Sequence, residues 1–190
     1  MRSSAALDMR TNRHVALLRG INVGGKNLIK MADLRACFEE MGLTEVQTYI
    51  QSGNVVFSSR RATKAKLEHA IEAALSETFA YSARVVVVSA AELARVVAQA
   101  PAGFGTAPDR YRYDVLYIKR PMTAVEALPQ LRIRPGVDEA RAGEHALYFQ
   151  RLISKLTQSH LAKIVQQPVY QHLTIRNWNT TTRLLAMASA

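Results

Sequence analysis

The fold is decided by residues 48–57, TYIQSGNVVF. The turn signal Ser52-Gly53-Asn54 lies between residues 46–51 and 55–58, two segments rich in β-forming residues. Two short strands joined by a tight turn form a hairpin, and the strands of a hairpin are antiparallel. The segment therefore predicts an antiparallel sheet and argues against a parallel one.

The elements around this hairpin complete a βαββαβ order. Residues 14–19 (HVALLR) and 84–88 are typical of buried strands. Between the strands, apolar residues repeat at helical spacing in two segments, at Leu34, Cys37, Phe38 and Met41 and again at Leu67, Ile71 and Leu75. This order is that of ferredoxin-like domains. Ser89 and Glu92 then have the spacing of a capping box, which predicts a further helix.

Residues 100–110 (APAGFGTAPDR) are rich in glycine and proline and separate two halves of the chain. We predict a disordered leader over residues 1–12, a ferredoxin-like subdomain over 13–100, a linker over 101–110 and a second α+β subdomain over 111–190. The predicted fold class is therefore α+β, with two subdomains.

The second half predicts a related βαββα unit with a C-terminal helix. Residues 113–119 alternate as a strand does, and Thr123 with Glu126 forms a second capping-box pattern. A hairpin is expected over residues 137–150, a helix over 156–165 that ends before Pro168, and a last helix after Asn177. No clear residue-level repeat joins the halves, so internal duplication stays an open question.

Composition favours a cytoplasmic protein with a true core. The chain has 190 residues, 48% of them hydrophobic, a net charge of +10 and one cysteine, Cys37. One cysteine excludes an internal disulfide framework and fits a reducing compartment. No apolar run reaches the roughly 18 residues of a membrane span, and residues 1–10 lack a secretory signal. The positive charge attracts phosphates or nucleic acid, although it also serves solubility.

The glycine-rich loop after the first strand is a candidate anion site. A strand, a glycine-rich loop and a helix in succession can aim backbone amides and a helix dipole at one anion. The G-x-x-x-x-G-K pattern of a P-loop is present, but Asn27 stands where magnesium binding requires Ser or Thr, and the sheet is antiparallel. The glycines could instead serve tight turns only. The candidate anion ligands are Arg19, Gly20, Asn22, Gly24, Gly25 and Lys26.

Three further groups of residues are candidates for the same site. Ser52 and Asn54 lie at the hairpin tip, where they either face the loop or form an ordinary turn. Two other segments place a cation at a helix start, against the helix dipole, and an anionic ligand or chance surface charge would account for it. These segments contribute Ser154, Lys155, Thr157, Arg176 and Asn177.

Catalytic and metal-binding patterns are not recognisable. The histidines lack metal-ligand spacing, Cys37 has no cysteine partner, and no Ser-His-Asp order stands out. We therefore predict no metal site and no cofactor, and the catalytic residues, if the protein is an enzyme, stay unknown.

Four blocks together resemble the bacterial domain-of-unknown-function family 1697: HVALLRGINVGGKNLIKMADLRACFEEMG, TYIQSGNVVF, SKLT and TIRNWNTT. The resemblance runs from about Arg13 to Met187. It implies a cytoplasmic α+β protein of two subdomains with no established activity. Residues 148–153 differ from the family pattern, which tends to carry a glycine before SKLT, so the resemblance does not extend to the loop geometry beside Lys155.

From these patterns we expect a module that binds a phosphate-bearing ligand, a nucleotide or nucleic acid, in a basic cleft between the subdomains. One alternative is an enzyme acting on a small phosphorylated substrate, with Lys and Arg stabilising phosphoryl charge. Another is a structural or partner-binding protein whose motifs serve only turns and caps. The sequence leaves the oligomeric state open.

Overall fold

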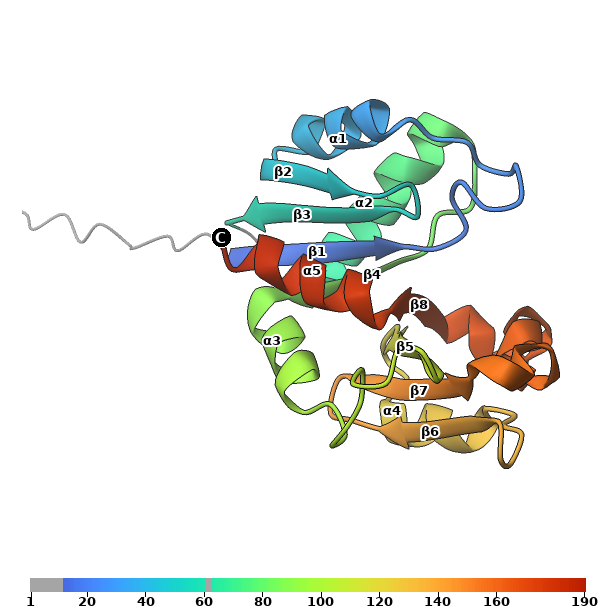
Figure 1. Cartoon of the computed structure of the whole chain (residues 1–190). Helices are drawn as coiled ribbons and strands as arrows, with labels where there is room; N and C mark the ends of the chain where they lie inside the picture. The colour runs from blue at the N-terminus through green and yellow to red at the C-terminus, as the bar shows by residue number, and fades with distance from the viewer. Residues whose placement is uncertain (1–11, 61–62) are drawn as a thin grey trace, which may run out of the picture.

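The computed structural model describes residues 12–60 and 63–190, which form two four-stranded antiparallel sheets (Figure 1). Sheet 1 has the order β2-β3-β1-β4. Its strands are β1 (Asn12–Leu18), β2 (Thr44–Tyr49), β3 (Asn54–Ser59) and β4 (Val85–Ser89). Sheet 2 has the order β6-β7-β5-β8. Its strands are β5 (Tyr111–Ile118), β6 (Asp138–Ala142), β7 (Ala146–Leu152) and β8 (Leu173–Asn177).

The helices lie in layers around the sheets. The α-helices are α1 (Met31–Glu40), α2 (Lys64–Phe79), α3 (Ala90–Ala98), α4 (Ala124–Ala127) and α5 (Trp178–Ala188). The 3₁₀ segments of the described residues are η1 (Leu128–Gln130), η2 (Ile153–Gln158), η3 (His160–Gln166) and η4 (Pro168–His172). Helices α1 and α2 cover the outer face of sheet 1, and α3 and α5 lie between the sheets (Figure 1). Helix α4, η3 and η4 cover the outer face of sheet 2.

The predicted α+β class and the βαββαβ order of the first half are confirmed. The proposed domain boundaries stay a prediction. Of the leader expected over residues 1–12, residues 1–11 lie outside the described residues, and Asn12 begins β1.

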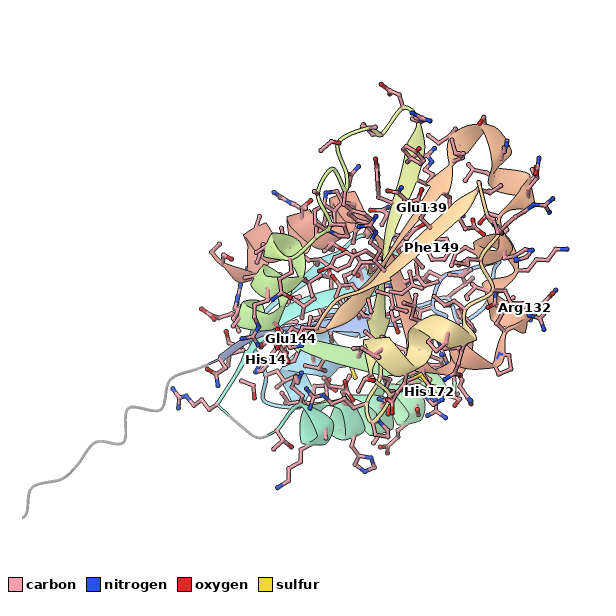
Figure 2. All side chains as sticks on the ribbon, turned by 90° about the horizontal axis from the view of Figure 1, so that it is seen from below. His14, Arg132, Glu139, Glu144, Phe149 and His172 are labelled. Atoms are coloured by element: carbon pink, nitrogen blue, oxygen red, sulfur yellow. The ribbon has the colours of Figure 1, made fainter. Side chains whose placement is uncertain are left out.

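The valines of strand β4 face two different layers of the core. Val85 and Val87 face α1 and α2, whereas Val86 and Val88 face the middle layer. A strand covered on both faces reads as a continuous apolar run, here VVVVS, instead of an alternating one. Sheet 2 is also covered on both faces, and Phe149 of β7 lies among the side chains at the centre of Figure 2.

Two expectations for the second half were wrong. The helix expected over residues 156–165 is replaced by η2 and η3, with non-helical backbone at Lys155 and Lys163. The buried pair Leu161 and Ile164 is three residues apart, which fits the three-residue turn of a 3₁₀ helix. Strand β8 was not expected, because five residues with a cation and an asparagine give a weak strand pattern.

With β8 included, both halves have the same topology. Leu18 pairs with Val85 in sheet 1 as Ile118 pairs with Leu173 in sheet 2. The next hydrogen bond is also repeated: the amide of Arg19 donates to the carbonyl of Arg84 at 2.9 Å, and that of Lys119 to the carbonyl of His172 at 2.8 Å. The halves are therefore duplicated in fold, and Arg19 and Lys119 occupy equivalent positions.

Candidate functional site

The glycine-rich loop folds as a miniature hairpin. The amide of Lys26 donates to the carbonyl of Val23 at 3.1 Å, and the residues between them, Gly24 and Gly25, have φ angles of +59° and +73°. Two positive φ angles in a two-residue turn define a type I′ turn, for which Gly-Gly is a preferred sequence. The turn accounts for these glycines without a P-loop.

Two asparagines fix the base of this loop. Asn22 donates from Nδ2 to the carbonyls of Ile29 and Gln51 at 3.0 and 2.9 Å, and its Oδ1 accepts the amide of Ile29 at 2.8 Å. Asn27 donates from Nδ2 to the carbonyl of Gly20 at 2.8 Å. Since Gln51 belongs to the β2–β3 turn, the loop is anchored to that turn and its tip has a defined position.

The tip is open to solvent. Gly24, Gly25 and Lys26 are exposed, and among the residues that the structure describes no group accepts a hydrogen bond from the amides of Gly24 and Gly25. A Cβ atom added at either glycine would meet nothing within 4 Å. Val23 and Leu28 on the same loop are 63% and 77% exposed. The loop therefore offers two amides, an ammonium group and aliphatic side chains on an open surface.

Arg19 at the start of the loop contacts the second half of the chain. Its Nη1 donates to the carbonyl of Tyr170 at 2.7 Å, and its guanidinium lies over the Tyr170 ring at 5.1 Å. Tyr170 belongs to η4, so the glycine-rich loop and η4 are at the same end of the molecule, on the right in Figure 1. Arg19 is half-buried, and burial lowers its pKa.

Arg176 joins the two halves and is 8% exposed. From β8 it reaches into sheet 1, and its five hydrogen bonds go to the side chain of Asn54 and to the carbonyls of Leu18, Ser52, Gly53 and Ile175. Burial lowers its pKa to about 10, so the guanidinium is charged at neutral pH. We call Arg176 with its acceptors in the first half the Arg176 clasp. The guanidinium is directed at protein acceptors and away from the open surface.

Ser52 and Asn54 belong to the Arg176 clasp. Asn54 is fully buried, and its Nδ2 donates to the carbonyl of Tyr49 at 2.9 Å and to Oγ of Ser52 at 3.2 Å. Gly53 between them has a φ of +77°, and a Cβ there would lie 2.6 Å from Cδ1 of Ile21. Of the predicted anion ligands, Asn22, Ser52, Asn54 and Arg176 therefore come together, but as a junction that shapes the loop.

The remaining candidates lie on the second half. Ser154, Lys155 and Thr157 are exposed on η2, and no hydrogen bond among the described residues connects them to the glycine-rich loop. The dipole argument for Lys155 was wrong, because its φ and ψ of −130° and 24° are not helical. Asn177 caps α5, since its Oδ1 accepts the amide of Thr180 at 2.7 Å.

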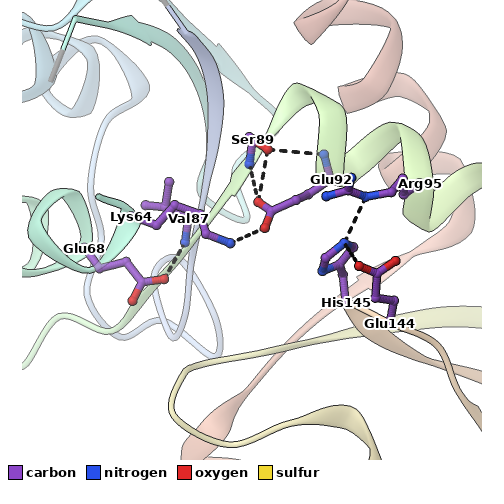
Figure 3. A network of polar contacts seen from close by, with 8 residues as sticks. All are labelled: Lys64, Glu68, Val87, Ser89, Glu92, Arg95, Glu144 and His145. Carbon is purple, nitrogen blue, oxygen red and sulfur yellow. Dashed lines mark hydrogen bonds and ion pairs between the residues drawn. The ribbon is translucent and has the colours of Figure 1, made fainter. Parts of the chain in front are cut away.

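A network of charges along the free edge of β4 was missed by sequence reasoning. The outward amides of Val85, Val87 and Ser89 donate at 2.8, 2.8 and 2.9 Å to carboxylates of Glu72, Glu68 and Glu92, respectively. Figure 3 shows the Glu68 and Glu92 contacts, with Lys64 paired to Glu92. The spacing of Glu68 and Glu72, four apart on one helix face, was the available signal.

Lys119 contacts the same edge from the second half. Its Nζ lies 2.9 Å from the carbonyl of Val85, 3.2 Å from Glu68 and 2.9 Å from Glu72. Arg19 and Lys119, which occupy equivalent positions, thus each contact the opposite half. Within residues 12–60 and 63–190, no three His, Cys, Asp or Glu side chains are grouped as metal ligands, and no helix has the length and apolarity to cross a membrane.

We predict that Glu92 makes the stability of the protein depend on pH in acid. Burial acts to raise the pKa of Glu92, but hydrogen bonds from Lys64 and Ser89 outweigh it and lower the pKa to about 2. A folded-state pKa below the unfolded value near 4.5 gives stabilisation that is complete above pH 4.5 and is lost as the pH falls toward 2. Urea unfolding of the wild type and Glu92→Gln between pH 2 and 6 measures it. The wild type should be the more stable at pH 6, and the difference should shrink in acid; a difference independent of pH would contradict the assignment.

Comparisons with known proteins agree with this fold. A family model described as "Protein of unknown function (DUF1697)" matches residues 11–148, a range that ends before the SKLT and TIRNW blocks. A solved structure, described as that of the conserved bacterial protein SP0830 from Streptococcus pneumoniae, is 25% identical with a TM-score of 0.82. The similarity covers 95% of this chain and 100% of that one. No curated protein has a significant match to the chain.

Proposed function

Because the chain belongs to a family of proteins of unknown function, DUF1697, we propose a function from its own contacts: it is a binding module that holds the phosphate backbone of a nucleic acid on the open tip of the glycine-rich loop. The observation that carries the proposal is the pair of unbonded amides at Gly24 and Gly25 beside the exposed ammonium group of Lys26. Neighbouring backbone amides and a lysine are the groups that bind phosphate oxygens.

The open surface favours a polymer over a small ligand. A small molecule needs a concave site that covers most of its surface. The tip has no such wall, because residues 23–28 are exposed and a Cβ atom added at Gly24 or Gly25 would meet nothing within 4 Å. A nucleic acid gains affinity from many separate phosphate contacts, and the chain carries a net charge of +10 to provide them. A nucleic acid is therefore favoured as the ligand over a free nucleotide or a small phosphorylated substrate.

The proposal divides the predicted ligands by role. Gly24, Gly25 and Lys26 contact phosphate. Asn22 and the Arg176 clasp hold the loop in place and act as positioning residues. Lys155 on η2 adds an exposed cation for a neighbouring phosphate of a long ligand. This role of Lys155 depends on the ligand being a polymer, since no hydrogen bond within residues 12–60 and 63–190 connects η2 to the loop.

We predict that Lys26→Ala weakens RNA binding and reduces its salt dependence. A single-stranded RNA of about 20 nucleotides is titrated by fluorescence anisotropy at 50–300 mM KCl. Removing one phosphate contact should lower the slope of log K against log salt by about 0.7, with similar losses for all RNA sequences.

The matched control is Lys66→Ala, which removes the same charge from an exposed position of α2. The control should change the slope by much less than Lys26→Ala. Absence of RNA and heparin binding at 50 mM KCl would refute the nucleic-acid function. Equal effects of the two substitutions on the slope would show that the glycine-rich loop is not part of the RNA-binding surface.

A further inference from the structure

A cavity of about 260 Å³ lies between the two halves, at the free edge of β4. The first half contributes the start of α2, the strand β4 and Glu92 of α3. The second half contributes residues 120–124, which follow β5, together with Ile118 and the turn residues Glu144 and His145. None of the predicted anion ligands lines this cavity, so it is distinct from the glycine-rich loop.

The carboxylates of Glu68 and Glu92 that line the cavity are already bonded. One carboxylate oxygen of Glu68 accepts a hydrogen bond from the amide of Val87 at 2.8 Å, and the other accepts one from Nζ of Lys119 at 3.2 Å. Glu92 likewise accepts Ser89 and Lys64 (Figure 3). A third carboxylate of the lining, that of Glu144, has one oxygen 3.2 Å from Nε2 of His145 and the other 3.5 Å from Nε2 of Gln99. Because both oxygens of each carboxylate have partners inside the protein, the cavity has little acceptor capacity left for a cationic ligand.

A hydrogen-bond donor group, in contrast, is left over. Arg120 lines the cavity, and among the described residues its guanidinium has no hydrogen-bond or ion-pair partner. His145 also lines the cavity, and its Nε2 lies 3.0 Å from Nε of Arg95 and 3.2 Å from a carboxylate oxygen of Glu144 (Figure 3).

Apolar side chains form a large part of the remaining lining. Val86 and Val88 of β4, Ile118 at the end of β5, and Pro121 and Met122 complete the wall. A ligand with a hydrocarbon portion would exclude water from these side chains, with a gain of about 25 cal/mol for each Å² removed from water. The cavity therefore combines the free guanidinium of Arg120 with apolar side chains.

We propose that this cavity binds a small organic carboxylate, held by the Arg120 guanidinium with its hydrocarbon portion against Val86, Val88 and Ile118. A planar carboxylate matches the fork of a guanidinium. A doubly charged phosphate is disfavoured, because it would lie beside the carboxylates of Glu68 and Glu92, both of which line the cavity. Since both halves form the walls, binding stabilises their association.

The test uses the full chain and straight-chain carboxylates from acetate to hexanoate, with inorganic phosphate for comparison. Amide chemical shifts from two-dimensional NMR report the location, and isothermal titration calorimetry reports affinity. We expect saturable shifts at residues 86–88 and 118–124, tighter binding as the chain lengthens to the capacity of the cavity, and weaker binding of phosphate. Arg120→Gln should weaken carboxylate binding at least about tenfold, the loss expected for one charge-assisted hydrogen bond.

Two variants make the result specific. Ala65→Met places a larger side chain at the cavity lining without changing charge and should block binding. Arg132→Gln removes a charge from an exposed position outside the lining, at the edge of the molecule in Figure 2, and should leave binding unchanged. No saturable shift at these residues with any carboxylate would overturn the proposal. So would phosphate binding as tight as that of butyrate, or equal effects of Arg120→Gln and Arg132→Gln. RNA binding does not enter this experiment, so its failure and that of the proposed function are distinguishable.

Discussion

Arg176→Met is expected to lower the free energy of unfolding by roughly 3–5 kcal/mol, the cost of removing one member of a buried hydrogen-bonded network that includes a charge. The substitution keeps an unbranched side chain but leaves the carbonyls of Leu18, Ser52 and Gly53 and the side chain of Asn54 without their cation. The acceptors on Leu18, Gly53 and Asn54 belong to buried hydrogen bonds and would be left unsatisfied inside the protein. For a chain of this length, the melting temperature should fall by roughly 6–20 °C, measured by circular dichroism.

Two further variants separate the contribution of hydrogen-bond geometry at residue 176 from that of its positive charge. Arg183→Met removes an arginine from an exposed position of α5 and should change stability by less than about 0.5 kcal/mol. Arg176→Lys keeps the charge but lacks the planar fork that reaches several acceptors at once, so it should restore only a small part of the loss. Full stability in Arg176→Lys would show that the charge matters and the hydrogen-bond geometry does not.

Gly53→Ala is expected to cost roughly 2–5 kcal/mol, from two additive causes. Alanine at a φ of +77° is strained by about 1–2 kcal/mol. The added methyl group would also lie 2.6 Å from Cδ1 of Ile21 and 2.9 Å from Cβ of Leu18, and such overpacking of a core costs about 1–3 kcal/mol. Any movement that relieves the contact also displaces the carbonyl of Gly53 from Arg176.

Gly42→Ala is the matched control for Gly53→Ala. Gly42 follows α1 with a φ of +76°, and a Cβ there would meet nothing within 4 Å. It therefore reports the backbone strain without the contact, and should cost about 1–2 kcal/mol. The difference between the two variants in urea unfolding measures the packing term. Equal losses would show that Ile21 moves aside without cost.

The fold of the first half was predictable because its signals are local. The hairpin at residues 52–54, the capping box at Ser89 and the apolar spacing of α1 and α2 all depend on residues close in sequence. Strand β8 and the 3₁₀ segments were not predictable in the same way, because they are stabilised by contacts with sheet 2 more than by their own pattern. Leu173, for example, is fully buried only because α4 and η3 cover that face of the sheet.

The candidate site was predictable in its residues but not in their roles. The sequence marks Arg176 and Asn54 as unusual polar residues, yet gives no indication that they bond each other across 122 positions. The exposure of Lys26 and the turn at Gly24 were accessible from the local pattern. The cavity at β4 was not, because Arg120 and Val87 are brought together only by the packing of the two halves.

The carboxylates along β4 also affect how separate molecules meet. An edge strand with unbonded amides is a template onto which a strand from another chain can add, and this addition is a common route to aggregation. In this protein the three outward amides of β4 already donate hydrogen bonds to the carboxylates of Glu68, Glu72 and Glu92. A strand from a second molecule therefore finds no free amide donors on β4. The same side chains that stabilise the fold therefore keep neighbouring molecules from forming a continuous intermolecular sheet through this edge.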